Sequence, residues 1–194
     1  MLRPAATFPI LLAATEPAGP WMVWRRPLAI AGLLGCVASL VASGVLTVRL
    51  IVPAALVWSY VPIAQVLALV AVTWRRRRAA PYARAVDLFF AGHGPWALFL
   101  IGIATSLAFL PPEFGWTRIR IWLGGMAGVM IWSAYLDFWF FRTVYRASPA
   151  AAVRDVVLVR AISWTLIFWI FAVPDATPLG IIGQVAEAVR ELTT

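Results

Sequence analysis

One histidine and one aspartate are the side chains best placed to do chemistry in this sequence. His93 is the only histidine of the 194 residues, and Asp137 lies inside a long apolar stretch. We expect both near the same end of neighbouring helices, within reach of Arg84 and Tyr135. A carboxylate beside an imidazole favours the imidazolium form, which would suit a proton relay or a ligand site. The alternative is a purely structural pair, in which Asp137 binds His93, Arg84 or Arg142.

The remaining residue types exclude several kinds of chemistry. Cys36 is the only cysteine, so the chain cannot form an internal disulfide bond. One cysteine and one histidine cannot complete a structural zinc site, and haem with two histidine ligands is excluded within one chain. No spacing supports a serine nucleophile paired with His93. We therefore expect no metal and no cofactor, and the sequence favours a protein that is not an enzyme.

The composition places these residues in a membrane. Hydrophobic residues make up 63% of the chain and charged residues 12%. Soluble domains are about 45–50% apolar and about 25% charged. The fold class predicted is all-α, a polytopic bundle of transmembrane helices. The net charge of +8 comes from sixteen basic residues, all arginine, and eight acidic ones. Because the arginines flank apolar stretches, they indicate membrane topology and not a nucleic-acid partner.

Apolar length and turn signals divide the chain into five predicted spans. A straight helix from residue 28 to residue 74 would be about 70 Å long, so the chain must reverse, and we place the reversal at 47–53. The predicted spans are 28–48, 50–73, 95–110, 121–141 and 156–173. The last one requires Arg160 to extend its head group to the interface, and a four-span chain with a re-entrant fifth segment is the alternative.

Local signals refine these boundaries. Gly92, His93, Gly94 and Pro95 form a poor helix interior, so a short helix over 81–91 should precede the third span. Residues 113–120 are predicted as a polar loop. Ser148 followed by Pro149 is typical of a helix start. We expect three regions: an N-terminal interfacial segment (1–27), the transmembrane domain (28–173) and an amphipathic C-terminal surface helix (174–194).

Arginine counting predicts the orientation. With five spans and a cytoplasmic N-terminus, twelve of the sixteen arginines lie on the cytoplasmic side of the cell membrane, and the C-terminus lies outside. The strongest basic cluster follows the second span and comprises Arg75, Arg76, Arg77 and Arg78. We expect this cluster to contact anionic lipid headgroups at the cytoplasmic face.

Small residues mark two faces suited to close helix packing. On the first span they recur at every fourth position, and on the fourth span they have the spacing of compact helix dimers. The residues are Ala31, Gly35, Ser39, Ser43, Gly124 and Gly128. Packing within one bundle is one interpretation, and a homo-oligomer or a membrane-protein partner is the other.

These patterns favour a non-catalytic membrane protein with a packing, assembly or lipid-organising role. The alternative function is a small transporter or ligand-binding protein that uses the region of His93 and Asp137 near the inner leaflet. That alternative predicts a polar cavity reached by Tyr82, Arg84 and Tyr135.

Overall fold

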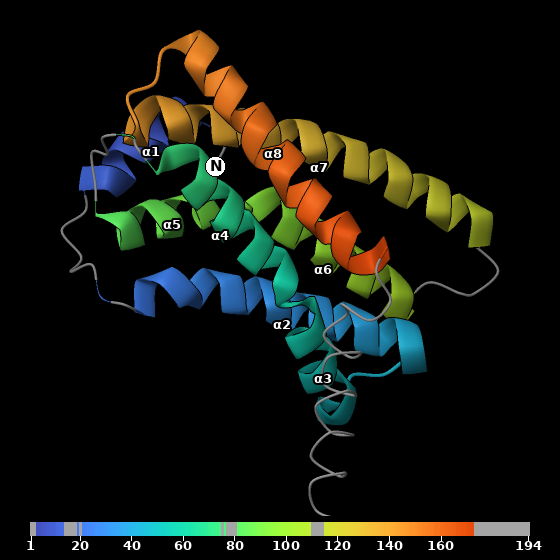
Figure 1. The fold of residues 1–194 in the computed structure, drawn as a ribbon. Coiled ribbons are helices and arrows are strands. Elements are labelled where there is room, and N and C mark those ends of the chain that lie inside the picture. The colour runs from blue at the N-terminus through green and yellow to red at the C-terminus, as the bar shows by residue number, and fades with distance from the viewer. Residues whose placement is uncertain are drawn as a thin grey trace, which may run out of the picture.

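The computed structural model describes residues 3–13, 19, 21–74, 76, 81–109 and 115–172, and every regular element in these ranges is a helix (Figure 1). The helices are α1 (Pro4–Ala13), α2 (Trp21–Ser43), α3 (Val48–Trp58), α4 (Tyr60–Thr73), α5 (Tyr82–Ala91), α6 (Gly94–Phe109), α7 (Gly115–Val144) and α8 (Pro149–Ala172). The predicted C-terminal surface helix at 174–194 lies outside the described residues.

Three helical stretches in the described ranges are long and apolar enough to cross a membrane. They are α2, the run Val48–Thr73 that contains α3 and α4, and α7. The number becomes four if α5 and α6, which meet at a bend of 45°, count as one span. The prediction of an all-helical chain with several potential membrane spans is therefore confirmed.

The first chain reversal occurs earlier than predicted. We expected the first helix to cover 28–48, but α2 begins at Trp21 and ends at Ser43. Gly44 then adopts a φ of +71°, in the left-handed region where glycine alone carries no steric penalty. The Ser39 hydroxyl donates to the carbonyl of Val45 at 2.8 Å and accepts from the amide of Thr47 at 3.2 Å. These bonds pair backbone groups of the tight loop, and the sequence patterns did not indicate this role for Ser39.

The predicted second span consists of two helices. α3 and α4 meet at Ser59, three residues before Pro62. Because Pro62 has no amide proton, the carbonyl of Trp58 lacks its usual hydrogen-bond donor in the helix. At the same break, the Ser59 hydroxyl donates to the carbonyl of Leu56 at 2.6 Å.

The break in the third predicted span is confirmed. α5 ends at Ala91 and α6 begins at Gly94, so Gly92 and His93 form the junction. The pair bends by 45° because this segment favours no continuous helix.

Of the last two helices, α7 begins earlier than predicted and α8 begins at the predicted residue. α7 begins at Gly115, so the predicted loop at 113–120 is wrong from residue 115 onward. α8 begins at Pro149 as predicted, and the Ser148 hydroxyl accepts from the amide of Ala151 at 3.3 Å.

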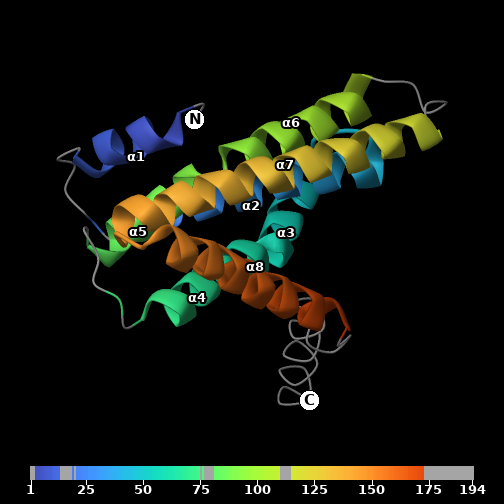
Figure 2. The same cartoon turned by 90° about the horizontal axis from the view of Figure 1, so that it is seen from above.

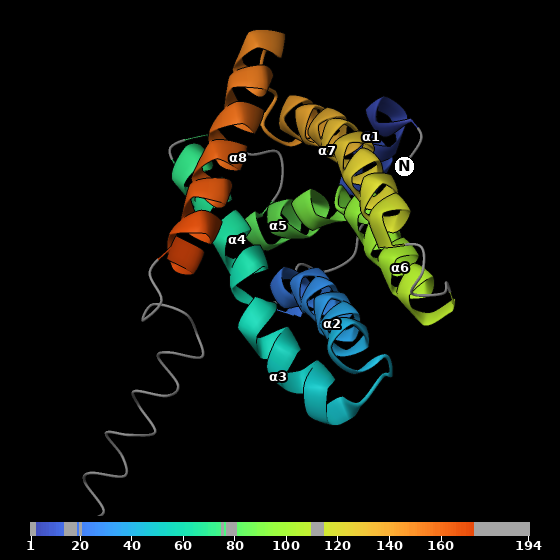
Figure 3. The ribbon, with the colours of Figure 1, turned by 90° about the vertical axis from the view of Figure 1, so that its right-hand side faces the viewer.

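The helices share two ends, which give the molecule a direction. The starts of α2, α5 and α8 lie toward the same side as the ends of α4 and α7 (Figures 1 and 2). We call this side the proximal end. The distal end holds the ends of α2 and α6 and the starts of α3 and α7. Figure 3 shows the helices as neighbours in pairs: α2 with α3, α4 with α8, and α6 with α7.

Aromatic side chains fill the core of the proximal end. Phe8 of α1 is completely buried, and its ring centroid lies 6.2 Å from that of Phe140 in α7. Phe89 of α5 lies 5.4 Å from the same ring. Helix α1 therefore packs on α5 and α7, and Trp21 to Arg26, which the prediction assigned to the interfacial segment, belong to α2.

Candidate functional site

Two arginines of α2 bind one carboxylate of α5 at the proximal end. Arg25 donates to Asp87 through Nε at 2.8 Å and through Nη2 at 3.0 Å. Arg26 donates to the same carboxylate through Nε at 2.8 Å. Asp87 is only 1% exposed, and charge-assisted bonds of this kind offset the loss of its hydration. The cluster holds the start of α2 against α5.

Arg84 belongs to this same cluster. Its Nη1 lies 3.9 Å from Oδ2 of Asp87, and its guanidinium donates to the carbonyl of Leu11 in α1. The same Nη1 lies 3.9 Å from the sulfur of Met22 in α2. The buried guanidinium thus joins α1, α2 and α5.

A second polar network joins α7 to α8. Arg160 donates to Oδ2 of Asp137 through Nε at 3.1 Å and Nη2 at 2.8 Å. Its Nη2 also donates to the Ser133 hydroxyl at 2.7 Å, and its Nη1 to the carbonyl of Met130 at 3.1 Å. Ser133 and Asp137 are four residues apart, so they lie on one face of α7. Arg160 is therefore the counterion of Asp137, a pairing that the sequence had not indicated.

Helix α6 completes this network. The indole Nε1 of Trp96 donates to the Ser133 hydroxyl at 3.2 Å, and the hydroxyl lies 3.2 Å from the carbonyl of Met130. Three helices thereby meet around one serine. Within a membrane such bonds fix helix contacts, because lipid offers polar groups no other partner.

His93 lies beside this network without a hydrogen bond to Asp137. Its Nδ1 lies 3.2 Å from the carbonyl of Phe89, which can only accept, so Nδ1 carries the proton in that contact. The imidazole is buried against the rings of Phe89 and Phe90, with centroids 5.0 and 4.9 Å away. Asp137 reaches the same junction, because its Oδ1 lies 3.9 Å from the position a Cβ would take at Gly92. His93 lies in the bend between α5 and α6, and Asp137 of α7 lies beside that bend.

Tyr135 does not take part. It is 49% exposed, and its ring packs edge-on against Trp139 with centroids 6.5 Å apart. Neither of the two cavities described below has Tyr82, Arg84 or Tyr135 among its described lining residues. Residue 135 is two positions from Asp137, which places its side chain on another face of α7.

The cavity next to His93 has a different lining. Its volume is about 410 Å³, and it lies between α2, α5 and the start of α6. The lining residues are Arg25, Arg26, Ala29, Ile30, Leu33, Phe90, Ala91, His93, Gly94 and Ala97. It combines two arginines and one imidazole with apolar side chains.

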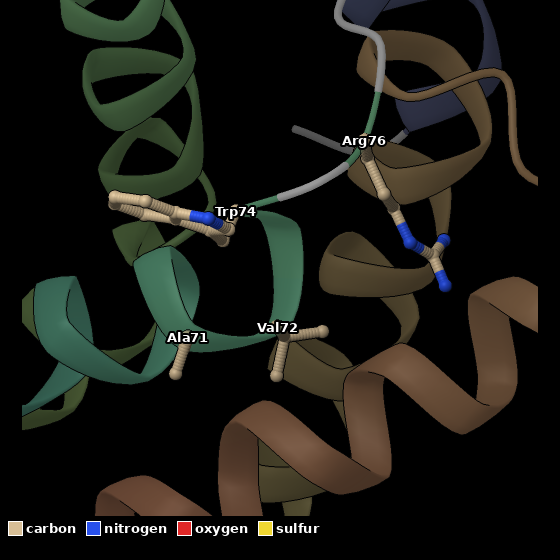
Figure 4. Close-up of a pocket in the computed structure, with 4 residues that line it drawn as sticks. All are labelled: Ala71, Val72, Trp74 and Arg76. Atoms are coloured by element: carbon tan, nitrogen blue, oxygen red, sulfur yellow. The ribbon is translucent and has the colours of Figure 1, made fainter.

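A second, larger cavity lies where α4 ends. Its volume is about 520 Å³, and the described residues that line it are Ala71, Val72, Trp74 and Arg76. Figure 4 shows the side chains of Trp74 and Arg76 pointing away from one another. Among its described lining residues, Arg76 is the charged one.

Arg76 has a partner inside the protein. Its guanidinium binds both oxygens of Asp155 in α8, with Nη2 to Oδ1 at 2.8 Å, and Asp155 is fully buried. Arg154 reaches the same carboxylate at 3.4 Å. Arg75, Arg77 and Arg78 lie outside the described residues. Of the predicted headgroup cluster, the described member links the end of α4 to the start of α8.

The small residues of α2 have two kinds of environment. Ala31, Gly35 and Ser39 are buried, and Ser43 is exposed. A Cβ at Gly35 would lie 2.5 Å from the carbonyl oxygen of Ile51 in α3. Gly35 therefore allows a backbone approach between α2 and α3 that a larger residue would prevent.

Gly124 and Gly128, the predicted packing glycines of α7, do not contact α6. Gly124 and Gly128 are exposed, and a Cβ at either would meet nothing within 4 Å. The contact with α6 involves the glycine between them: a Cβ at Gly125 would lie 3.1 Å from Phe99. The face that carries the predicted dimer spacing is thus uncovered by the described part of the chain.

Sequence reasoning missed four of the residues that build these networks: Arg25, Arg26, Asp87 and Asp155. It counted the arginines as topology signals, and it considered carboxylates only in the middle of a span. A usable signal existed for Arg160, because it is the only charge in the apolar part of α8, as Asp137 is in the apolar part of α7.

Within the described residues, no group of three or more histidine, cysteine, aspartate or glutamate side chains could hold a metal ion. Comparison with protein-family models, with curated proteins and with solved structures finds no match for this chain.

Proposed function

We propose that this chain is a multi-pass protein of the cell membrane with five spans, a cytoplasmic N-terminus and an external C-terminus. The spans are α2, α3 with α4, α5 with α6, α7, and α8. The ion pairs support the shared cytoplasmic side of the start of α2, the end of α4, the start of α5 and the start of α8. Arg25 and Arg26 bind Asp87, and Arg76 binds Asp155, so each pair joins residues that arginine counting assigns to the cytoplasmic side. The proximal end is then the cytoplasmic end.

Within that membrane the protein has a non-catalytic role in packing, assembly or lipid organisation. One observation carries this proposal. The carboxylates of Asp87, Asp137 and Asp155 are buried, and each is bound by an arginine from outside its own helix. A carboxylate held in this way stabilises helix contacts and is poorly suited to move protons. Anionic lipid at the cytoplasmic face and a second membrane protein or second copy of the chain are the partners proposed.

A ligand-binding or transport function is the second candidate. It is favoured by the cavity beside His93, at a junction where the backbone is not helical. In a membrane, irregular backbone is tolerated where protein surrounds it or where it lines a cavity, and ligands often bind at such breaks.

Reporter fusions test the topology directly. A reporter placed after Ala80 or Ala150 should be cytoplasmic, and one placed after Gly115 or Thr194 should be external. An external signal at Ala150 would contradict the five-span arrangement, because α7 would then not cross.

A substitution of His93 distinguishes the two proposed functions. His93→Phe keeps the aromatic packing with Phe89 and Phe90 but removes both ring nitrogens. If the role is packing and assembly, the variant should purify with the same membrane partners and in the same yield as the natural chain. Loss of a partner or bound small molecule at unchanged folded yield would favour the ligand-binding function.

A further inference from the structure

The cavity beside His93 has a charged end and an apolar end. Arg25 and Arg26 border it at the start of α2, and Ala29, Ile30 and Leu33 continue along the same face of that helix. From Arg26 to Leu33 the helix rises by about 10 Å. Across the cavity, Phe90 and Ala97 supply further apolar surface. The lining therefore matches a molecule with a charged head and at least the first part of a hydrocarbon chain.

The charge at the head is positive. Arg25 and Arg26 bind the same carboxylate, so two positive guanidinium groups share the single negative charge of Asp87. Arg26 contacts Asp87 through Nε, and its side chain is 40% exposed, so its terminal nitrogens can donate to a further group. The planar fork of arginine matches the geometry of phosphate and carboxylate oxygens.

The size of the site agrees with a bound headgroup. The cavity volume of about 410 Å³ falls within the range of about 300–1,000 Å³ typical of small-ligand sites. His93, which is buried, and exposed Gly94 form its edge at the junction of α5 and α6. A complete lipid would exceed this volume, so its chain would continue into the surrounding bilayer.

We propose that this cavity binds an anionic phospholipid, with the phosphate at Arg25 and Arg26 and the first acyl carbons along Ala29, Ile30 and Leu33. This inference rests on the proposed membrane insertion, and it names the lipid class that the cytoplasmic end organises. Charge complementarity selects the headgroup, and the apolar face of α2 selects a lipid over a free phosphate.

The test uses the full chain purified in an uncharged detergent. Phosphatidylglycerol, phosphatidylcholine with the same acyl chains, and inorganic phosphate are added separately, and binding is followed by native mass spectrometry and by thermal unfolding. We expect phosphatidylglycerol to bind at least about tenfold more tightly than phosphatidylcholine, and to raise the unfolding temperature more than phosphate does. Equal binding of the two lipids would overturn the proposal, and equal stabilisation by phosphate would show a site for the headgroup alone.

Two tryptophan variants locate the site. Ala29→Trp fills the cavity without removing either arginine, and it should weaken binding of phosphatidylglycerol by about tenfold. Leu28→Trp is the matched control, because Leu28 is exposed on the same turn and does not line the cavity. Unchanged binding by Ala29→Trp would refute the location. If Ala29→Trp does not fold, Leu33→Trp gives the same test.

Failure of the membrane proposal has a separate signature. If alkaline carbonate releases the chain from membranes into solution, the proposed function is wrong whatever lipids bind. If the chain stays in the membrane and shows no preference for phosphatidylglycerol, only the lipid site is wrong.

Discussion

Different interactions stabilise the proximal end and the distal end of the molecule. At the proximal end, aromatic rings pack against one another, and arginines bind the buried carboxylates of Asp87 and Asp155. Toward the distal end, large apolar side chains face outward, including Phe109 of α6 at 82% exposed and Trp116 of α7 at 75%. Among the described residues, the indole of Trp122 donates to the Ser106 hydroxyl there at 3.1 Å and joins α7 to α6.

The difference shows how this chain divides its stabilisation. An ion pair in a low-dielectric interior is sensitive to the loss of either partner, because the remaining charge has no water around it. Apolar side chains facing lipid are already in a favourable solvent, so packing gains little from hydrophobicity alone. The proximal end should therefore specify the fold, and the distal end should be free to meet lipid or a partner.

The largest effect is expected where α7 meets α8. Arg160→Leu leaves the Asp137 carboxylate without its counterion and should lower the free energy of unfolding by about 3 kcal/mol. The measurement is thermal unfolding of the purified chain in detergent. Arg154→Leu is the control, because Arg154 is 61% exposed and reaches Asp155 only at 3.4 Å.

The double variant Arg160→Leu with Asp137→Leu sharpens this result. Replacing both charges by apolar groups should restore most of the lost stability. If the double variant is as unstable as the single one, the network stabilises the helices through its hydrogen bonds and not through charge neutralisation.

The next effect concerns the close contact between α2 and α3. Gly35→Ala places a methyl group 2.5 Å from a backbone oxygen, so the helices must separate, at a cost of about 2 kcal/mol. Gly32→Ala meets nothing within 4 Å and should instead stabilise the helix by about 0.5–1 kcal/mol. Chemical or thermal unfolding of both variants measures the difference. Equal effects would mean that α2 and α3 do not approach this closely.

A smaller effect is expected at Asp87. Arg26→Gln removes one charge-assisted bond, while Arg25 keeps two bonds to the same carboxylate. The loss in free energy of unfolding should be about 1.5 kcal/mol. The variant that replaces both arginines should lose more than the sum of the single replacements, because Asp87 is then without either partner from α2. Additive losses would contradict a shared carboxylate.

The smallest effect on folding is expected at the exposed glycines of α7. Gly124→Leu and Gly128→Leu should raise the free energy of unfolding by no more than about 0.5–1 kcal/mol through helix propensity alone, since no described atom lies within 4 Å of the added Cβ. Their effect on association is the informative measurement. If this face meets a second copy, the detergent-extracted size should fall, and an unchanged size would exclude that contact.

The sequence predicted the parts of the fold that depend on local chemistry. The break at Gly92 and His93 and the helix start at Pro149 follow from glycine, proline and serine in the backbone itself. The early start of α7 was missed because Trp116 and Ile119 in the predicted loop are compatible with a helix, and two arginines there were given more weight. The reversal at Gly44 was missed because the apolar run continues beyond it.

The candidate site was only half predictable. His93 and Asp137 were expected near the same end of neighbouring helices, and the structure places the Asp137 carboxylate beside Gly92, the residue before His93. Arg160 was not expected as the partner of Asp137. Which of sixteen arginines meets a given carboxylate depends on helix rotation and crossing angle, and neither has a signature in a single sequence.

Composition and local residue patterns are enough to show that this chain is helical and apolar, where several of its helices begin or break, and how its arginines are distributed. Those properties follow from backbone preferences and from the cost of placing charge in hydrocarbon, which act on each segment separately. The pairing of each arginine with an aspartate, the glycine that faces a neighbouring helix, and the place of each cavity became known from the packed helices. These features depend on the relative placement of helices far apart in the chain, so they arise only when the helices pack.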